Sequence, residues 1–142
     1  MTRIDFYTNA ESRVHVACRL TEKAFIQKLK VILFVPDPNM SKTVDKMLWS
    51  QRATGFVPHC YADSKLAHAT PVLITHELAN TGPDDLLINL GDECPASFGR
   101  FRRLVEIVDG DAQSKETARI RWRHYKERGY DIHHVDLAGS QQ

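Results

Sequence analysis

The sequence predicts an α/β fold in which short buried strands alternate with longer amphipathic helices. Three mostly apolar segments, rich in leucine or β-branched residues and bounded by polar or turn residues, are Val31–Val35, Pro71–Thr75 and Leu86–Leu90. This pattern is typical of strands that are buried on both faces of a parallel sheet. The chain has 142 residues and no internal repeat or Pro/Gly-rich linker. It is therefore expected to form one domain over residues 1–142.

The remaining elements follow from periodicity and from turn residues. Further strands are expected at Ile4–Tyr7, Leu104–Val108 and Tyr130–Val135. Amphipathic stretches between the strands predict helices over Ala10–Leu29, Ser41–Gln51 and Ala112–Arg128. Gly129 fits the residue that ends the last helix, because glycine readily adopts a left-handed conformation. The segment Thr54–Thr70 is predicted to be mostly loop.

Composition excludes several classes of protein. Nineteen Lys and Arg against 18 Asp and Glu leave a net charge of +1, far too small for a general nucleic-acid coat or a polybasic membrane binder. The apolar run Val31–Val35 is much shorter than the ~20 residues that span a bilayer, and the first residues lack the apolar stretch of a secretory signal. Cys18, Cys60 and Cys94 are odd in number and widely spaced. We therefore expect a reduced, cytoplasmic protein without a disulfide framework.

Motifs for catalysis and cofactor binding are missing from the sequence. Its isolated glycines form neither G-x-G-x-x-G nor G-x-x-x-x-G-K-[ST], and no G-x-S-x-G elbow is present. His59 precedes Cys60, and His133 precedes His134, but no C-x-x-C or H-x-x-x-H spacing accompanies them. We therefore expect no cofactor, no metal and no catalytic residue, with surface or hydrogen-bonded histidines. A nucleophilic pair of Cys60 with a histidine stays open.

The last predicted helix carries a row of cations beside an apolar stripe. At 100° per residue the row falls within about 80° of arc and contains Lys115, Arg119, Arg123 and Lys126. The neighbouring stripe, which should face the sheet, contains Ala118, Trp122 and Tyr125, with Trp122 at the border of the two faces. Such a surface could bind an acidic peptide that has an apolar residue of its own. The alternative is a solvated helix face with Trp122 as ordinary core.

A second candidate surface surrounds Trp49. The stripe that should enter the core from the second helix contains Met40, Val44, Met47 and Leu48. Trp49 points about 100° or more away from the centre of that stripe. The apolar segment Phe56-Val57-Pro58-His59 follows soon afterwards. This combination predicts an aromatic anchor of a protein interface, and the alternative is that a neighbouring loop covers Trp49.

Taken in order, these segments resemble the chi subunit family of bacterial DNA polymerase III holoenzyme, whose members are accessory proteins of the clamp loader. The matching pieces are Phe6-Tyr7, Leu48-Trp49, Phe56-Val57-Pro58-His59, Pro71-Val72, Leu87-Ile88-Asn89-Leu90, Phe98, Val105–Asp109 and Lys115 through Gly129-Tyr130. Each piece alone is weakly specific. Their order and spacing over roughly 130 residues make the resemblance specific.

The resemblance implies a three-layer α/β/α domain with a largely parallel, Rossmann-like sheet and no catalysis. It implies two partners, the psi subunit of the clamp loader and the acidic C-terminal tail of single-stranded DNA-binding protein. The family's tail-binding pattern, Lys-x3-Arg-x2-aromatic-basic, falls on Lys115, Arg119, Trp122 and Arg123. The psi-binding surface falls on Trp49 and Phe56, together with Val57 and Pro58 of the same segment. The chain departs from relatives that have Tyr where it has Trp122, which keeps a flat apolar wall.

The expected function is a non-catalytic replisome adaptor that links the clamp loader to protein-coated single-stranded DNA. One alternative is a Rossmann-like enzyme with a degenerate nucleotide site, which only the α/β pattern favours. Another is direct binding of single-stranded nucleic acid through the basic helix, which the small net charge disfavours. Whether a repair helicase shares the surface of Trp49 and Phe56 stays open, and no membrane partner is expected.

Overall fold

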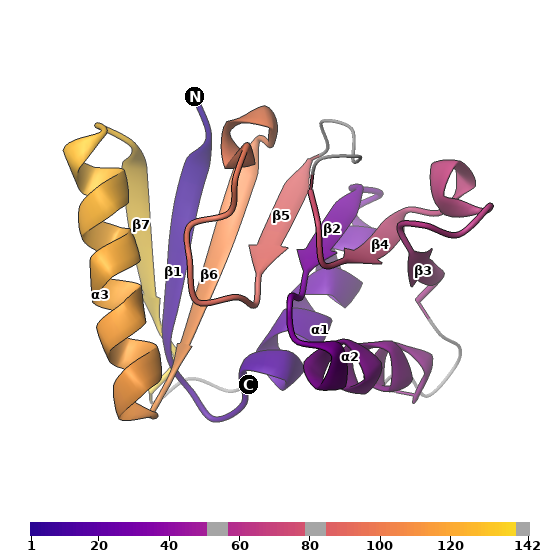
Figure 1. The fold of residues 1–142 in the computed structure, drawn as a ribbon, viewed down its shortest axis with the longest axis horizontal. Coiled ribbons are helices and arrows are strands. Elements are labelled where there is room, and N and C mark those ends of the chain that lie inside the picture. The colour runs from indigo at the N-terminus through magenta and orange to yellow at the C-terminus, as the bar shows by residue number, and fades with distance from the viewer. Residues whose placement is uncertain (51–56, 79–84, 139–142) are drawn as a thin grey trace.

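A computed structural model describes residues 1–50, 57–78 and 85–138 (Figure 1). Within these residues one sheet contains seven strands in the order β3-β4-β2-β5-β6-β1-β7, and all neighbouring strands are parallel. The strands are β1 (Arg3–Ala10), β2 (Val31–Phe34), β3 (His59–Tyr61), β4 (Val72–Thr75), β5 (Leu86–Asn89), β6 (Arg103–Asp109) and β7 (Asp131–Asp136). The helices are α1 (Arg13–Ile26), α2 (Pro38–Ser50) and α3 (Ala112–Glu127), with short 3-10 turns η1 (Ala67–Ala69) and η2 (Phe98–Arg100).

The helices cover both faces of the sheet, as the predicted three-layer arrangement requires. Consecutive residues of a strand point to opposite faces, so Leu33 packs in the core beneath α1 and α2, whereas Ile32 packs in the core on the α3 side. Figure 1 places α1 and α2 together towards the β3 end of the sheet and α3 beside β7 at the other end. The prediction of an α/β fold is confirmed, and the sheet is more uniformly parallel than expected. No helix in the described residues is long and apolar enough to cross a membrane.

Local signals explain where the helices begin and end. Ser12 caps α1 by accepting a hydrogen bond from the His15 N–H. Helix α3 is capped at both of its ends. Asp111 accepts from the Ser114 N–H at its start. Gly129, with a φ of 81°, follows its end, so the predicted stop is confirmed. The expected start of the first helix at Ala10 is wrong, because β1 continues to that residue and buries it.

The region predicted to be mostly loop contains one short strand. β3 has only three residues, none of them buried, and pairs with β4 at the edge of the sheet. Edge strands lack the continuous apolar run that identifies a buried strand, so the sequence pattern missed β3. Residues 54–56 of that region lie outside the described part of the chain. The second helix begins at Pro38, before the predicted Ser41, since proline suits the first turn of a helix.

Candidate functional site

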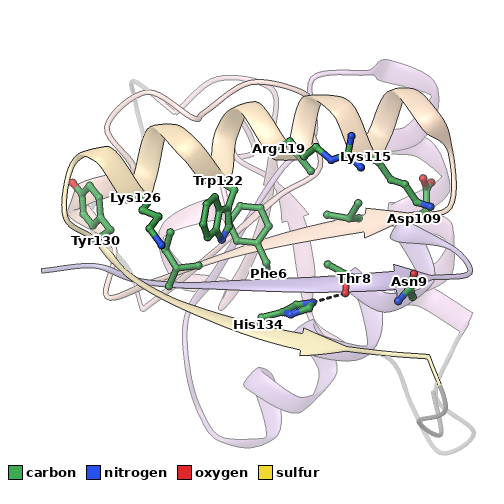
Figure 2. Close-up of a pocket in the computed structure, with 13 residues that line it drawn as sticks. Phe6, Thr8, Asn9, Asp109, Lys115, Arg119, Trp122, Lys126, Tyr130 and His134 are labelled. Atoms are coloured by element: carbon green, nitrogen blue, oxygen red, sulfur yellow. Dashed lines mark hydrogen bonds between the residues drawn. The ribbon is translucent and has the colours of Figure 1, made fainter.

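A pocket of about 740 Å³ lies between α3 and the strands β1, β6 and β7 (Figure 2). These three strands are parallel neighbours, so their carboxyl ends meet at one edge beneath the start of α3. The residues that line the pocket are Phe6, Thr8, Asn9, Val108, Asp109, Lys115, Ala118, Arg119, Trp122, Lys126, Tyr130, Ile132 and His134.

The helical wall of the pocket combines three cations with one aromatic ring. Lys115, Arg119, Trp122 and Lys126 recur every three or four residues and therefore share one face of α3. The Lys126 Nζ lies 4.7 Å from the centroid of the Trp122 ring, which is a favourable cation–π distance. Arg119 Nη1 lies 3.5 Å from Oε2 of Glu116, and both side chains are exposed. Exposed pairs of this kind are worth about 0–1 kcal/mol, so an acidic ligand can displace Glu116.

The strand wall is apolar in its centre and polar towards the ends of β1 and β7. Phe6 is almost fully buried and lines the pocket together with Trp122. The His134 Nε2 lies 2.6 Å from the Thr8 hydroxyl, which joins the two strands across their side chains. Next to this pair, the Asn9 side-chain amide donates to Asp136 over 2.7 Å. An occupant would therefore meet an apolar floor between polar groups.

A buried polar network fixes α3 on the sheet behind the pocket. Arg121, 3% exposed, donates through Nε to the Glu106 carboxylate over 3.1 Å. The same carboxylate accepts from the Tyr125 hydroxyl at 2.7 Å and from the Asn89 amide at 3.1 Å. Burial raises the pKa of Glu106 above its ordinary value, while the Arg121 charge and these hydrogen bonds oppose the rise. Burial and the Glu106 charge also raise the pKa of Tyr125, so its hydroxyl stays a donor.

Arg121 lies outside the cationic row that the sequence predicts on α3. Its helical angle places it with the buried Ala118 and Tyr125, so periodicity could have identified it as a core residue. Trp122 is 40% exposed, in agreement with its predicted place at the border of the two faces.

The structure brings together most of the residues expected in the tail-binding site. Lys115, Arg119 and Trp122 all line the pocket, whereas Arg123 is exposed on α3 and is not among the lining residues. Lys126 belongs to the cationic row but was not among the site residues expected from the resemblance. The strand residues Thr8, Asn9 and His134 were missed, because they lie far from α3 in the sequence and no local pattern marks them.

The surface around Trp49 is built differently. Trp49 is 53% exposed, in agreement with its position off the buried stripe of Val44 and Leu48. Its ring meets the His59 ring edge-on, with centroids 5.3 Å apart. His59 Nδ1 donates to the Val57 carbonyl oxygen over 2.6 Å, because a carbonyl oxygen can only accept. Its Nε2 lies 2.8 Å from Asp45 of α2, so the imidazole joins α2 to the segment before β3.

The other residues expected at this surface differ in their exposure. Phe56 lies outside the described residues. Val57 has no exposed surface and packs in the core, so its side chain does not reach the surface as the prediction requires. Pro58 is half-buried. Among the described residues expected at this surface, Trp49 is thus the one large apolar side chain that is exposed.

The histidines and cysteines do not gather into a metal centre in the described part of the chain. No group of three or more His, Cys, Asp or Glu side chains lies close enough there to hold a metal ion. Cys60 is half-buried and its neighbour His59 is engaged by Asp45 and Val57. Burial raises the pKa of the Cys18 thiol to about 12, which makes it a poor nucleophile.

Similarity to solved structures supports the fold alone. The C-terminal domain of the DEAD-box protein Dbp5 superposes with a TM-score of 0.63 over 96% of this chain and 91% of that domain, at 14% sequence identity. Identity this low carries no functional argument, because one fold serves many functions.

Similarity in sequence identifies the family. The DNA polymerase III subunit chi of Pseudomonas aeruginosa is 36% identical over 93% of this chain and 94% of its own length. The protein of the same name from Haemophilus influenzae is 27% identical over 82% of each chain. The family described as "DNA polymerase III chi subunit, HolC" matches residues 1–133. With this match over most of its length, the chain belongs to the DNA polymerase III chi subunit family.

Proposed function

We propose that this chain is a non-catalytic adaptor that links the clamp loader, through the psi subunit, to the acidic C-terminal tail of single-stranded DNA-binding protein. The observation that carries the proposal is the pocket beneath α3, where three cations on the helical wall face an apolar floor. Such a site suits a peptide that brings carboxylates on either side of an apolar side chain.

The arrangement of the cations suggests how the peptide is held. The planar Arg119 guanidinium can grip a carboxylate with two hydrogen bonds, whereas Lys115 and Lys126 act as point charges. The two lysines are eleven positions apart, which corresponds to about 16 Å along the helix axis. An extended peptide covers that length with about five residues, at ~3.3 Å each. The apolar floor of Phe6 and Ile132 lies between the ends and would receive the apolar residue of the tail.

Arg123 has a secondary part in this proposal. It is exposed on α3 outside the lining residues, so it attracts the acidic tail at longer range and contributes less to the bound complex. Charge pairs at exposed sites are individually weak and are screened by salt. The expected affinity is therefore moderate and salt-dependent, which suits a contact that is made and broken during synthesis.

The Trp49 surface is the proposed binding site for psi. A half-exposed tryptophan, whose ring meets His59 edge-on, supplies the kind of aromatic anchor that dominates protein interfaces. The sheet order places β3, beside this surface, at one edge, and β7, beside the pocket, at the opposite edge (Figure 1). Two partners at opposite ends of a sheet do not compete for space, as an adaptor requires.

A binding comparison tests this function directly. The protein is presented with bare single-stranded DNA, with DNA coated by single-stranded DNA-binding protein, and with DNA coated by the same protein lacking its C-terminal tail. We expect retention on the intact coated DNA only. Equal retention on bare DNA would support direct nucleic-acid binding instead, and retention on the tailless coat would place the contact outside the tail.

A further inference from the structure

His134 is an ionisable group of the pocket for which the tail-binding pattern on α3 provides no role. It lies on β7, in the strand wall that faces α3 (Figure 2). Side chains alternate along β7, so Ile132 and His134 line the pocket while His133 points to the opposite face of the sheet. His133 is held there by Asp131, 2.9 Å away. Two adjacent histidines thus have separate environments.

The Thr8 hydroxyl holds the His134 ring in place whichever proton state the ring adopts. A hydroxyl can donate to a bare ring nitrogen or accept from a protonated one, so the 2.6 Å contact with Nε2 survives protonation. The other ring nitrogen, Nδ1, carries a proton both in the imidazolium and in the neutral tautomer whose bare Nε2 accepts from Thr8, and the imidazolium adds a positive charge to this donor. His134 is therefore positioned in advance as a carboxylate donor.

The charges near His134 come from α3, β6 and β7, whereas β1 contributes the uncharged Phe6, Thr8 and Asn9. Helix α3 presents Lys115, Arg119 and Lys126, whereas β6 presents Asp109. On β7 itself the nearby acid is Asp136, which accepts from the Asn9 amide at 2.7 Å and from the Ala138 N–H at 2.9 Å. These two hydrogen bonds, with the His134 charge as a lesser cause, hold the pKa of Asp136 below its ordinary value.

This balance of charges changes when an acidic ligand enters. In the empty pocket three cations are present, and Asp136 is already engaged by Asn9 and Ala138. Carboxylates placed between the walls would add negative charge beside the ring and favour the imidazolium. By thermodynamic linkage, a ligand that favours protonation must itself bind more tightly when the group is protonated.

We propose that His134 is a further ligand-binding residue of the pocket: its imidazolium holds a carboxylate from the strand side, opposite Arg119, and takes up a proton as the acidic peptide binds. The assignment rests on the proposed binding of an acidic tail in this pocket. It makes the strand wall part of ligand recognition and makes occupancy sensitive to pH.

The test measures the affinity of a peptide copy of the acidic tail by calorimetry between pH 5.5 and 8. The wild-type protein is compared with His134→Gln and with the matched control His133→Gln, an adjacent histidine on the opposite face. We expect wild-type affinity to rise about threefold to fivefold on acidification, which is the size of an exposed charge pair. His134→Gln should abolish this rise and His133→Gln should keep it. Repetition in buffers with different ionisation enthalpies should show proton uptake in the wild type and the control alone.

The outcomes separate this assignment from the function on which it rests. Peptide binding with the same pH dependence in the wild type and in His134→Gln would overturn the role of His134 and leave the tail site intact. Failure of the wild type to bind the peptide at any pH would overturn both.

Thr8→Val, which keeps a β-branched residue in β1 but removes the hydroxyl, should reduce the pH dependence. A full pH dependence in this variant would contradict the anchoring of the ring by Thr8.

Discussion

Two arginines separated by one residue on α3 occupy opposite environments. Arg119 is exposed and pairs at 3.5 Å with the equally exposed Glu116. Arg121 is 3% exposed and lies 3.1 Å from Glu106, which has no exposed surface. The comparison shows that the residue type does not reveal the role, because the direction of the side chain decides whether an arginine holds the fold or meets a partner.

The largest expected effect comes from breaking the buried pair. Arg121→Met should lower the free energy of unfolding by about 3–5 kcal/mol, because Glu106 would remain buried without its countercharge. Denaturant unfolding measures this loss. The matched control Arg119→Met should change stability by less than ~0.5 kcal/mol, as for ordinary surface substitutions. Equal stability of the two variants would remove the distinction between the arginines.

The loss of stability caused by Arg121→Met should depend on pH. The pKa of Glu106 is already raised in the folded protein, and removal of the Arg121 charge raises it further. The folded state then binds the Glu106 proton more tightly than the unfolded state does. Stability is therefore retained at low pH and lost as pH rises through the folded-state pKa. The variant should be closer to wild-type stability at pH 5 than at pH 8, and the opposite trend would contradict the account.

Trp49, at the other end of the sheet, is a second exposed residue whose truncation should affect binding but not folding. Trp49→Ala should weaken association with psi by at least ~2 kcal/mol, the typical effect of truncating an interfacial tryptophan. Folding and tail-peptide affinity should be retained, because the side chain is 53% exposed and lies away from the pocket. A melting curve and two binding assays on one preparation measure all three properties. A collapse in melting temperature would show that Trp49 belongs to the core.

A change in salt concentration should affect peptide binding at the exposed face of α3 more than the stability contributed by its buried face, and this difference should be smaller than the preceding effects. Raising the salt concentration should weaken tail-peptide binding about severalfold, because exposed charges are screened. The free energy of unfolding should change much less, because water and ions do not reach the buried pair of Arg121 and Glu106. Titrations and unfolding curves at low and high salt measure the two responses. Salt-independent peptide binding would argue against the cationic wall.

Parts of the fold could be predicted because the signals are local. The strand β2 alternates Ile32 and Leu33 between two cores, and such burial on both faces produces a continuous apolar run. The edge strand β3 is half-solvated and gives no such run. The position of Trp49 follows from helical periodicity, and its exposure agrees with that prediction.

The pocket could be predicted only on its helical side. Lys115, Arg119 and Trp122 recur at helical spacing, so one segment reveals them together. The opposite wall brings Thr8 next to His134 across 126 positions of sequence. That proximity depends on the parallel pairing of β1 with β7, which no local pattern encodes.

The central claim is that the pocket face of α3, rather than its general positive charge, binds the acidic tail. Arg119→Ala and Arg123→Ala remove the same charge from the same helix, but only Arg119 lines the pocket. Calorimetry with the tail peptide should show a loss of about 1–3 kcal/mol for Arg119→Ala, as for charge-assisted hydrogen bonds, and a clearly smaller loss for Arg123→Ala. Unchanged affinity in Arg119→Ala, or an equal loss in both variants, would contradict the claim.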